Sequence, residues 1–281
     1  SMARLYFKNT LFKKLDEMNK FVTNLVHERK RAIKNNEVSE SNLLSLLLKA
    51  REEMKERGEF EQGTEMTDQH VIDESTTFLL AGHETTSTWL QWIFYFLASY
   101  PQVQDKVIAE IDACWEQFTK ENSHNATNFS ELIANMKYSS NVLNEALRLY
   151  PPVYIIDKEC EKDAKVGEHC IPKGTQLGIS VLSVHRNPNV WKNPNEFDPD
   201  RWSEERLKEM PEDDVRFGFI PFLVGQRDCA GKLFVQKEVK LIVAMVLKEF
   251  RVELPKDWKL ELETTFTLKP KHLPINLVRR N

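Results

Sequence analysis

The chain has 281 residues, of which 41% are hydrophobic and 29% charged, and its formal net charge is -4. These proportions are those of an ordinary folded protein, and the length allows a large hydrophobic core. The negative balance argues against a general nucleic-acid-binding protein, because neutralising phosphates requires a basic face. Four scattered cysteines do not make a disulfide framework, and the lack of a C-x-x-C pair argues against zinc, so a reducing compartment fits best.

Targeting and nucleotide-binding signals are not evident in the sequence. Ser1–Met2 resembles a remnant of expression, and no signal peptide or membrane anchor follows it. The longest apolar region, 76–99, carries His83 and Glu84, which predicts a core helix and not a membrane span. With nine glycines and no G-x-G-x-x-G or P-loop motif, electrons from a nicotinamide or flavin would have to come from another protein.

Hydrophobic periodicity predicts helices in the first half of the chain. Capping residues and prolines indicate where these helices begin and end. The expected helices are Asn9–Lys34, Ser41–Glu56, Thr67–Ser99, one starting at Pro101, a short one capped by Ser130–Glu131 before Met136, and Tyr138–Leu149, with loops at 35–39 and 58–66.

The pattern changes after Pro151–Pro152, where short β-like runs and turn signals follow one another. The expected strands are Val153–Ile156, Ala164–Val166, Cys170–Ile171 and Gln176–Val181, followed by a coil at Asn187–Trp202 and a surface loop at Ser203–Val215. A helix ending near Phe250 precedes a small terminal sheet of Arg251–Leu254, Leu260–Leu262, Phe266–Leu268 and Ile275–Val278. The predicted fold class is mainly α with small β-sheets.

One cysteine stands where a glycine-bearing loop becomes a helix. Residues 221–231 read PFLVGQRDCAG and lead into an apolar-periodic run. Glycines let the backbone approach a flat or bulky group, and the partial positive charge of a helix N-terminus favours a thiolate. A lone cysteine is more often a buried structural residue. Here, however, the pattern F-x-x-G-x-R-x-C-x-G is complete, as Phe222, Gly225, Arg227, Cys229 and Gly231.

On these residues the sequence resembles the cytochrome P450 family of haem-thiolate monooxygenases. The resemblance extends over essentially the whole chain and implies that 1–281 is the C-terminal portion of a single cytochrome P450 domain whose N-terminal part is absent. It implies that Cys229 binds the iron of haem b. Thiolate ligation donates electron density to the iron and favours cleavage of the O–O bond.

A second motif, AGHETT at 81–86, lies inside the expected long helix. Glycine within a helix costs about 1 kcal/mol relative to alanine, so Gly82 needs a reason. Ala81 and Gly82 would give room for a cofactor, and the resemblance implies that Glu84 and Thr85 deliver protons during oxygen activation. Taken alone, the motif would more often be a kinked core helix with a solvated glutamate.

A third motif, E-x-x-R, places Glu145 and Arg148 on one helical face within ion-pair reach. Such pairs usually lie on the surface and contribute little. The resemblance implies that Arg201, in FDPDRW, completes a buried Glu–Arg–Arg triad that fixes the coil supporting the cysteine loop. Bidentate geometry would stabilise such a triad.

The resemblance also implies contacts to haem and to substrate. Arg227 is expected to pair with a propionate, as are Lys158, which lacks the guanidinium fork of arginine, and His185, for which a surface position is an equal alternative. Phe222, Gly225 and Ala81 would pack around the cofactor. Candidate substrate contacts, each of which could equally be core, are Phe78, Val153, Tyr154, Ile155 and Phe266.

The implied activity is insertion of one oxygen atom from O2, the co-substrate, into a lipophilic substrate such as a fatty acid, sterol or xenobiotic. Electrons would come from NADPH through a separate reductase, which Lys232, Lys237 or Lys240 could attract. The resemblance to microsomal members implies an endoplasmic reticulum membrane location for the full protein, attached through its missing N-terminal part, with this fragment soluble. Alternatives are a haem-thiolate isomerase, against which Glu84 and Thr85 argue, and a truncated, non-catalytic binding or regulatory protein.

Overall fold

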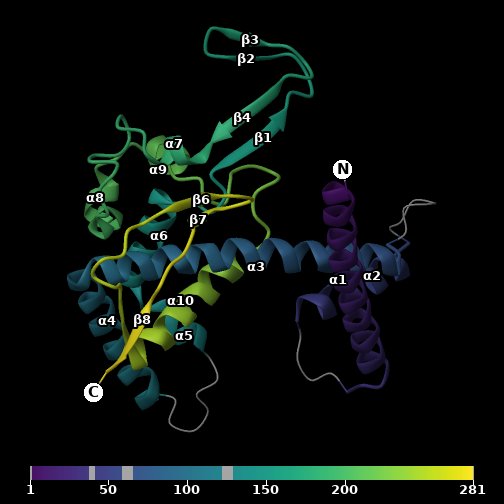
Figure 1. Ribbon diagram of the computed structural model, residues 1–281, viewed down its shortest axis with the longest axis horizontal. Helices are drawn as coiled ribbons and strands as arrows, with labels where there is room; N and C mark the ends of the chain where they lie inside the picture. Colours follow the sequence, from purple (N-terminus) through teal and green to yellow (C-terminus); the bar gives the residue numbers. More distant parts are fainter. Residues whose placement is uncertain (1, 38–41, 59–65, 122–128, 281) are drawn as a thin grey trace. The chain divides into compact units, whose positions relative to one another are not determined.

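The computed structural model describes residues 2–37, 42–58, 66–121 and 129–280, and the side chains from residue 12 onward (Figure 1). The chain forms two compact units, 1–83 and 84–281. The long helix α3 (Asp68–Ser99) runs through the boundary between them. The fold is mainly α with small antiparallel sheets, which confirms the predicted class.

The first unit consists of helix α1 (Met2–Lys34), helix α2 (Leu43–Glu56) and the first part of α3. Its small core is made of buried aliphatic side chains from all three helices: Val22, Val26, Leu48, Val71 and Ile72. Asn42 caps α2 by accepting a hydrogen bond from Ser45 N at 3.0 Å. Helix α1 begins at Met2, earlier than the predicted Asn9, and helix α2 begins at Leu43, two residues after the predicted Ser41. The predicted loops at 35–39 and 58–66 lie partly outside the described residues.

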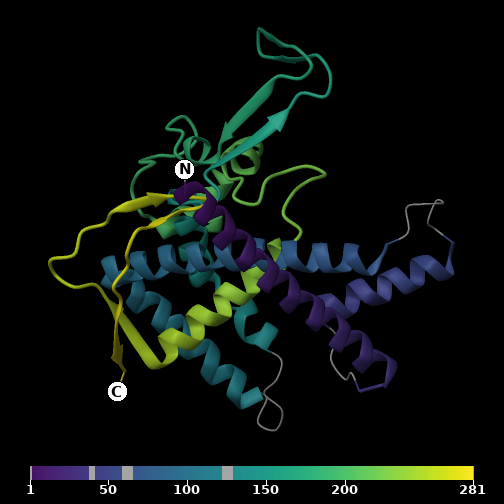
Figure 2. The same cartoon turned by 45° about the vertical axis from the view of Figure 1, so that its right-hand side comes forward.

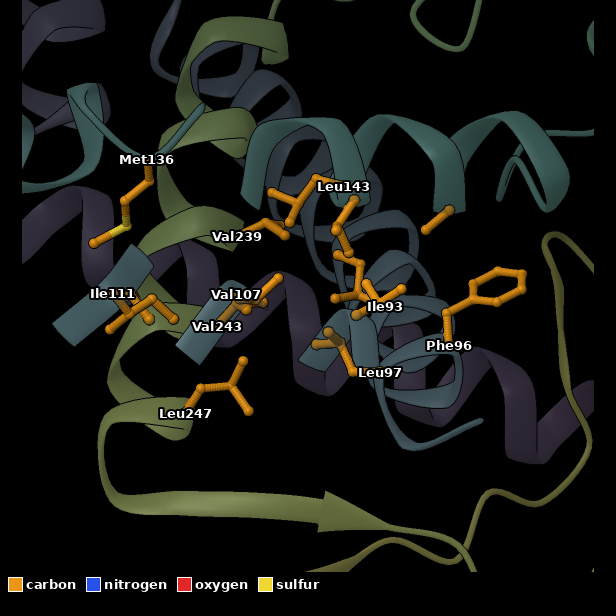
Figure 3. Packing of buried hydrophobic residues seen from close by; sticks show 14 of the residues in the cluster. Ile93, Phe96, Leu97, Val107, Ile111, Met136, Leu143, Val239, Val243 and Leu247 are labelled. Carbon is orange, nitrogen blue, oxygen red and sulfur yellow. The ribbon is translucent and has the colours of Figure 1, made fainter. Parts of the chain in front are cut away.

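Four helices and the second part of α3 enclose the core of the second unit. These are α4 (Pro101–Glu121), α5 (Phe129–Ala134), α6 (Lys137–Leu149) and α10 (Lys232–Glu249). Figure 3 shows how their aliphatic side chains meet, with Val107 and Ile111 from α4 facing Val243 and Leu247 from α10. Pro101 occupies the first turn of α4, where its missing N–H leaves no hydrogen bond unmade.

The strands form four separate antiparallel pairs. They are β1 (Ile155–Glu159) with β4 (Gln176–Ser180), β2 (Ala164–Val166) with β3 (His169–Ile171), β5 (Phe250–Glu253) with β8 (Asn276–Arg279), and β6 (Leu262–Thr264) with β7 (Leu268–Pro270). Figure 2 shows β1 and β4 as a hairpin that carries β2 and β3 at its far end. The tail was predicted as one small sheet, but its strands form two separate pairs. β5 pairs with β8, and β6 pairs with β7.

The segment between β4 and the cysteine loop is more helical than predicted. Helix α7 (Val181–His185) begins where a strand was expected to end, and the coil that follows closes with a 3-10 turn, η1 (Pro199–Trp202). The predicted surface loop at 203–215 is wrong, since it contains helix α8 (Glu204–Lys208) and most of helix α9 (Glu212–Gly218). Ser203 caps α8 through Arg206 N at 3.4 Å, and the acidic first turns of both helices suit the helix dipole.

Candidate functional site

The cysteine loop is a tight turn held at its base by backbone hydrogen bonds. Leu223 N donates to Ile220 O at 3.1 Å, and Cys229 N donates to Phe222 O at 2.9 Å. Two residues take left-handed backbone angles, Leu223 at φ 63° and Gly225 at φ 97°. A side chain at Gly225 would be strained in that conformation, and Leu223 already bears such strain, of order 1–2 kcal/mol. The turn thereby sets Cys229 directly before the N-terminus of α10.

The loop rests on the core at one end and is open at the other. Phe222 is half-buried, and its ring meets the ring of Trp89 edge-on with centroids 6.1 Å apart. Cys229 and Arg227 are exposed. Directly after them, Leu233 and Phe234 on the first turn of α10 are 74% and 70% exposed. A thiol at a helix N-terminus, with a cation and apolar side chains beside it, is a donor set that suits a large planar apolar group bearing carboxylates.

The catalytic candidates on α3 have partners that the sequence did not reveal. Thr267 Oγ1 donates to Glu84 Oε1 at 2.9 Å, and Lys269 Nζ lies 3.2 Å from the same oxygen. Thr267 is fully buried and also shares a hydrogen bond with Thr88 Oγ1 at 3.1 Å. The signal available in the sequence was period-two spacing, which places Thr267 and Lys269 on one face. Nothing in that pattern says which helix they meet.

The AGHETT segment itself is regular helix. Ala81 and Gly82 are exposed, and Thr85 is half-buried. The helix continues without a break through 81–86, so any opening of its backbone by a hydroxyl is not part of this conformation. Hydroxyls of α3 do bond back along the helix, for example Ser87 Oγ to Glu84 O at 3.1 Å, and they leave the helix intact. The roles of Glu84, Thr85 and Ala81 therefore stay predictions.

The predicted triad residues are brought together and buried. Glu145 and Arg148 are fully buried, and Arg201 is 6% exposed. Arg148 grips the Glu145 carboxylate with two hydrogen bonds, from Nε at 2.9 Å and Nη2 at 2.8 Å. Arg201 Nε reaches Oε1 of the same carboxylate at 2.9 Å. These are charge-assisted bonds, and the Arg148 pair has the bidentate geometry that makes such contacts strong.

The two guanidinium groups and the one carboxylate leave a net positive charge in the protein interior. Backbone carbonyls stabilise this charge by accepting hydrogen bonds from the arginines. Arg148 donates to the carbonyls of His185, Pro194 and Glu196 at 2.7–3.1 Å. Arg201 donates to those of Lys192 and Asn193 at 2.9 and 3.3 Å. All five carbonyls belong to 185–196, so the triad binds this coil directly.

Trp202 is a member of the cluster that sequence reasoning missed. Its indole Nε1 donates to Glu145 Oε2 at 2.9 Å, and its ring packs 4.4 Å from that of Phe219. A buried tryptophan needs an acceptor for its N–H, which was the available signal, because Trp202 directly follows Arg201. Through Phe219 the cluster reaches the residues that lead into the cysteine loop.

The remaining candidates are dispersed. Lys158 is exposed on β1, and Phe266 is 73% exposed at the turn between β6 and β7. Ile155 is exposed on β1, whereas Phe78, Val153 and Tyr154 are half-buried. The alternative of a surface position for His185 is wrong, because its side chain is fully buried. The haem and substrate contacts of this group stay predictions.

Two further properties of the described residues bear on function. Among them, no group of three or more His, Cys, Asp and Glu side chains is placed to hold a metal ion. Within the part of the chain that the structure describes, no helix has the length and hydrophobicity needed to cross a bilayer.

Comparison with known proteins agrees with this geometry. The family model described as cytochrome P450 matches residues 3–277. An 11-oxo-beta-amyrin 30-oxidase of Medicago truncatula is 32% identical over 265 residues, covering 94% of this chain and 48% of that protein. Cytochrome P450 4F5 of Rattus norvegicus is 37% identical over 199 residues, covering 70% of this chain and 36% of that protein. The chain thus spans about half the length of such curated relatives, or less.

Solved structures with a similar fold are also found. The haem domain of a cytochrome P450DA mutant superposes with a TM-score of 0.82 at 27% identity, covering all of this chain and 56% of that one. A second structure, the cytochrome P450 CYP102L1, gives 0.80 at 26% identity, covering 99% and 58%. Fold and cysteine loop together therefore place the protein in the same structural class as these cytochromes P450. The chain belongs to the cytochrome P450 family.

Proposed function

We propose that this chain is the C-terminal, cysteine-bearing portion of a haem-thiolate monooxygenase that inserts one oxygen atom from O2 into a lipophilic substrate. The observation that carries the proposal is the presentation of Cys229. An exposed thiol stands at the start of α10, after a loop turned by left-handed Leu223 and Gly225 and closed by the Cys229–Phe222 backbone hydrogen bond. Strained backbone such as that of Leu223 clusters at ligand-binding and active sites, which favours a ligand here.

Haem b fits the residues present. Cys229 would hold the iron as a thiolate, Arg227 and Lys158 would neutralise propionates, and Phe222, Gly225 and Ala81 would line the cofactor. When bound, haem supplies dioxygen binding and the oxidising power for attack on C–H bonds. The protein's own contribution is to hold the sulfur in a fixed position relative to the core. The base of the loop does this, because Phe222 is packed against Trp89.

Glu84 and Thr85 are the proposed proton-delivery groups. Glu84 is held at its carboxylate by Thr267 and Lys269, so its position on α3 is fixed by a hydroxyl and a cation. A general acid or base must be held within hydrogen-bond reach of the proton that it moves, and a fixed carboxylate meets that need. Thr85 supplies a hydroxyl on the next residue of the helix.

The substrate class and the electron donor are proposed from the family. Relatives carry names such as 11-oxo-beta-amyrin 30-oxidase and leukotriene-B4 omega-hydroxylase 3, which favours a fatty acid, sterol or xenobiotic as substrate. Electrons would come from an NADPH-dependent reductase. Lys232 and Lys237 are exposed on α10 and suit an acidic partner, whereas Lys240 is half-buried and donates to Ile133 O at 3.2 Å. An endoplasmic reticulum location for the full-length protein stays a prediction.

The proposal is tested by the optical spectrum of the 281-residue chain after addition of haem, reduction with dithionite and exposure to carbon monoxide. We expect the strongly red-shifted Soret band of thiolate ligation, and we expect Cys229→Ser to lose it. Cys170→Ser is the matched control, because Cys170 is also exposed but lies on β3. A chain that shows no haem spectrum would overturn catalysis by this portion alone and favour a non-catalytic binding role.

A further inference from the structure

The imidazole of His185 sits between the buried triad and the start of the cysteine loop. His185 is the last residue of α7, and its side chain is fully buried. On one side, Arg148 Nη1 donates to the His185 carbonyl at 2.9 Å. On the other side, Ile220 N donates to His185 Nε2 at 2.9 Å. Ile220 is the residue directly before Pro221, where the loop begins.

We propose that His185 is a positioning residue that connects Arg148 of the triad to the backbone of Ile220 and so fixes where the cysteine loop starts. The inference rests on the proposed function, because it explains how the sulfur of Cys229 is kept in place for haem. It differs from a contact between His185 and a haem propionate, because the partner of the ring nitrogen is a backbone amide of this chain.

Ile220, the residue that His185 holds, also anchors the start of the loop. Ile220 O accepts from Leu223 N at 3.1 Å, so one residue fixes both the histidine and the turn. The ring of His185 also lies 5.2 Å from that of Phe219. Residues from Val224 to Ala230 are exposed and make few contacts of their own with the core. The contacts at the two ends of the loop therefore fix the position of the Cys229 sulfur.

Gly218, two residues before Ile220, is also held by a hydrogen bond. Trp191 Nε1 donates to Gly218 O at 3.1 Å, and a Cβ at Gly218 would come within 2.7 Å of Val190 Cγ1. Val190 and Trp191 belong to the coil that the triad arginines bind. The backbone before the loop is thus fixed at Gly218 and at Ile220. At the second of these points, a single ring nitrogen of His185 makes the contact.

The chemistry of the ring suits an acceptor. Nε2 can accept a hydrogen bond only when it carries no proton, which requires the neutral imidazole with its hydrogen on Nδ1. Burial lowers the pKa of His185 to about 4, and the Arg148 guanidinium acts in the same direction, while the nearby backbone of Leu147 and Arg148 opposes both. The ring therefore stays neutral at ordinary pH and keeps its acceptor.

Hydrogen exchange of the Ile220 amide in the full 281-residue chain, without haem, tests this inference. His185→Phe keeps the bulk and removes the acceptor, so we expect exchange at Ile220 to accelerate about tenfold, the effect of losing one buried hydrogen bond. His185→Gln can place a carbonyl oxygen near the position of Nε2 and should restore most of the protection. His169→Phe is the matched control, because His169 is exposed on β3.

A second measurement keeps the proposal falsifiable if the phenylalanine variant does not fold. Nitrogen NMR of the unmutated chain should show His185 as the neutral form with hydrogen on Nδ1, which packing alone does not require. The proposal is overturned if hydrogen resides on Nε2, or if exchange at Ile220 changes less than about twofold in a folded His185→Phe variant. Neither result depends on haem, so failure here is distinct from loss of the carbon monoxide spectrum.

Discussion

The buried carboxylate of Glu145 offers the sharpest test of how this structure is held together. Glu145 accepts five hydrogen bonds, two from Arg148 and one each from Arg201, the Asp198 backbone and Trp202. Glu145→Gln keeps the shape of the side chain. It replaces one acceptor oxygen by an N–H2 group that faces donors, and it removes the negative charge that both guanidinium groups contact.

The magnitude follows from the contacts. All five bonds are charge-assisted, because the acceptor is a carboxylate. Three of them have a guanidinium donor, and at about 1.5–3 kcal/mol each these three would total roughly 5–9 kcal/mol if all were lost. Backbone carbonyls of 185–196 still solvate both arginines, so the lower range observed for broken buried ion pairs, about 3–5 kcal/mol, is the better expectation. That is a large share of the stability of a typical domain, which is about 5–15 kcal/mol.

Urea unfolding followed by tryptophan fluorescence measures the loss. All six tryptophans lie in 84–281, and Trp191 and Trp202 belong to the cluster, so the signal reports the second unit. Glu116→Gln is the matched control, because Glu116 is exposed on α4 and pairs with Lys120 at 2.6 Å, and it should cost less than about 0.5 kcal/mol.

A double variant identifies the cause of the loss. Glu145→Gln combined with Arg201→Gln should be less destabilised than the sum of the single changes by more than about 1 kcal/mol, because removing the second charge relieves the first defect. If Glu145→Gln lowered the free energy of unfolding no more than Glu116→Gln does, the reasoning from buried charge would be refuted.

Three further outcomes are expected. Burial lowers the pKa of His185 from 6.5 to about 4, so its stabilising effect is complete above about pH 6.5 and is lost as the pH falls toward about 4. Urea unfolding should show a loss of about 2 kcal/mol between about pH 8 and about pH 5 that His185→Phe does not show. Lys269→Met and Glu84→Gln should couple by about 0.5–1 kcal/mol in a thermal double-mutant cycle, whereas Lys271→Met, whose partner is Glu261, should not couple to Glu84. Gln104→Leu should lower the free energy of unfolding by about 2–3 kcal/mol in urea unfolding, because it leaves Val252 N and the carbonyls of Leu97 and Val252 without this partner. A loss below about 0.5 kcal/mol would contradict this.

Sequence motifs and periodicity were enough for the fold class and most helices. The long helix ending at Ser99, the helix start at Pro101 and the helix ending before Pro151 follow from prolines and apolar spacing, which act within a few residues. The short helices α8 and α9 were missed, because five to seven residues carry too few periods for a pattern to stand out from a polar loop.

The residues of the candidate site likewise fall into those predicted from local motifs and those found only in the structure. The complete cysteine motif and the E-x-x-R spacing are local, so Cys229, Glu145 and Arg148 were named from the sequence alone. The partners of Glu84 were not, since Thr267 and Lys269 lie 183 and 185 residues away. A period-two pattern tells which face of a strand a residue occupies, but not what that face meets.

His185 shows most clearly what tertiary structure decides. From the sequence, His185 could be either a haem-facing residue or a surface histidine, because a single imidazole in a polar segment is compatible with both. Its burial and its bond to Ile220 N result from packing α7 against α6 and α9. What the sequence determined by itself was the chemistry that each residue carries and the local element that holds it. The tertiary structure alone decided which of these residues meet, because those contacts depend on the simultaneous packing of segments far apart in the chain.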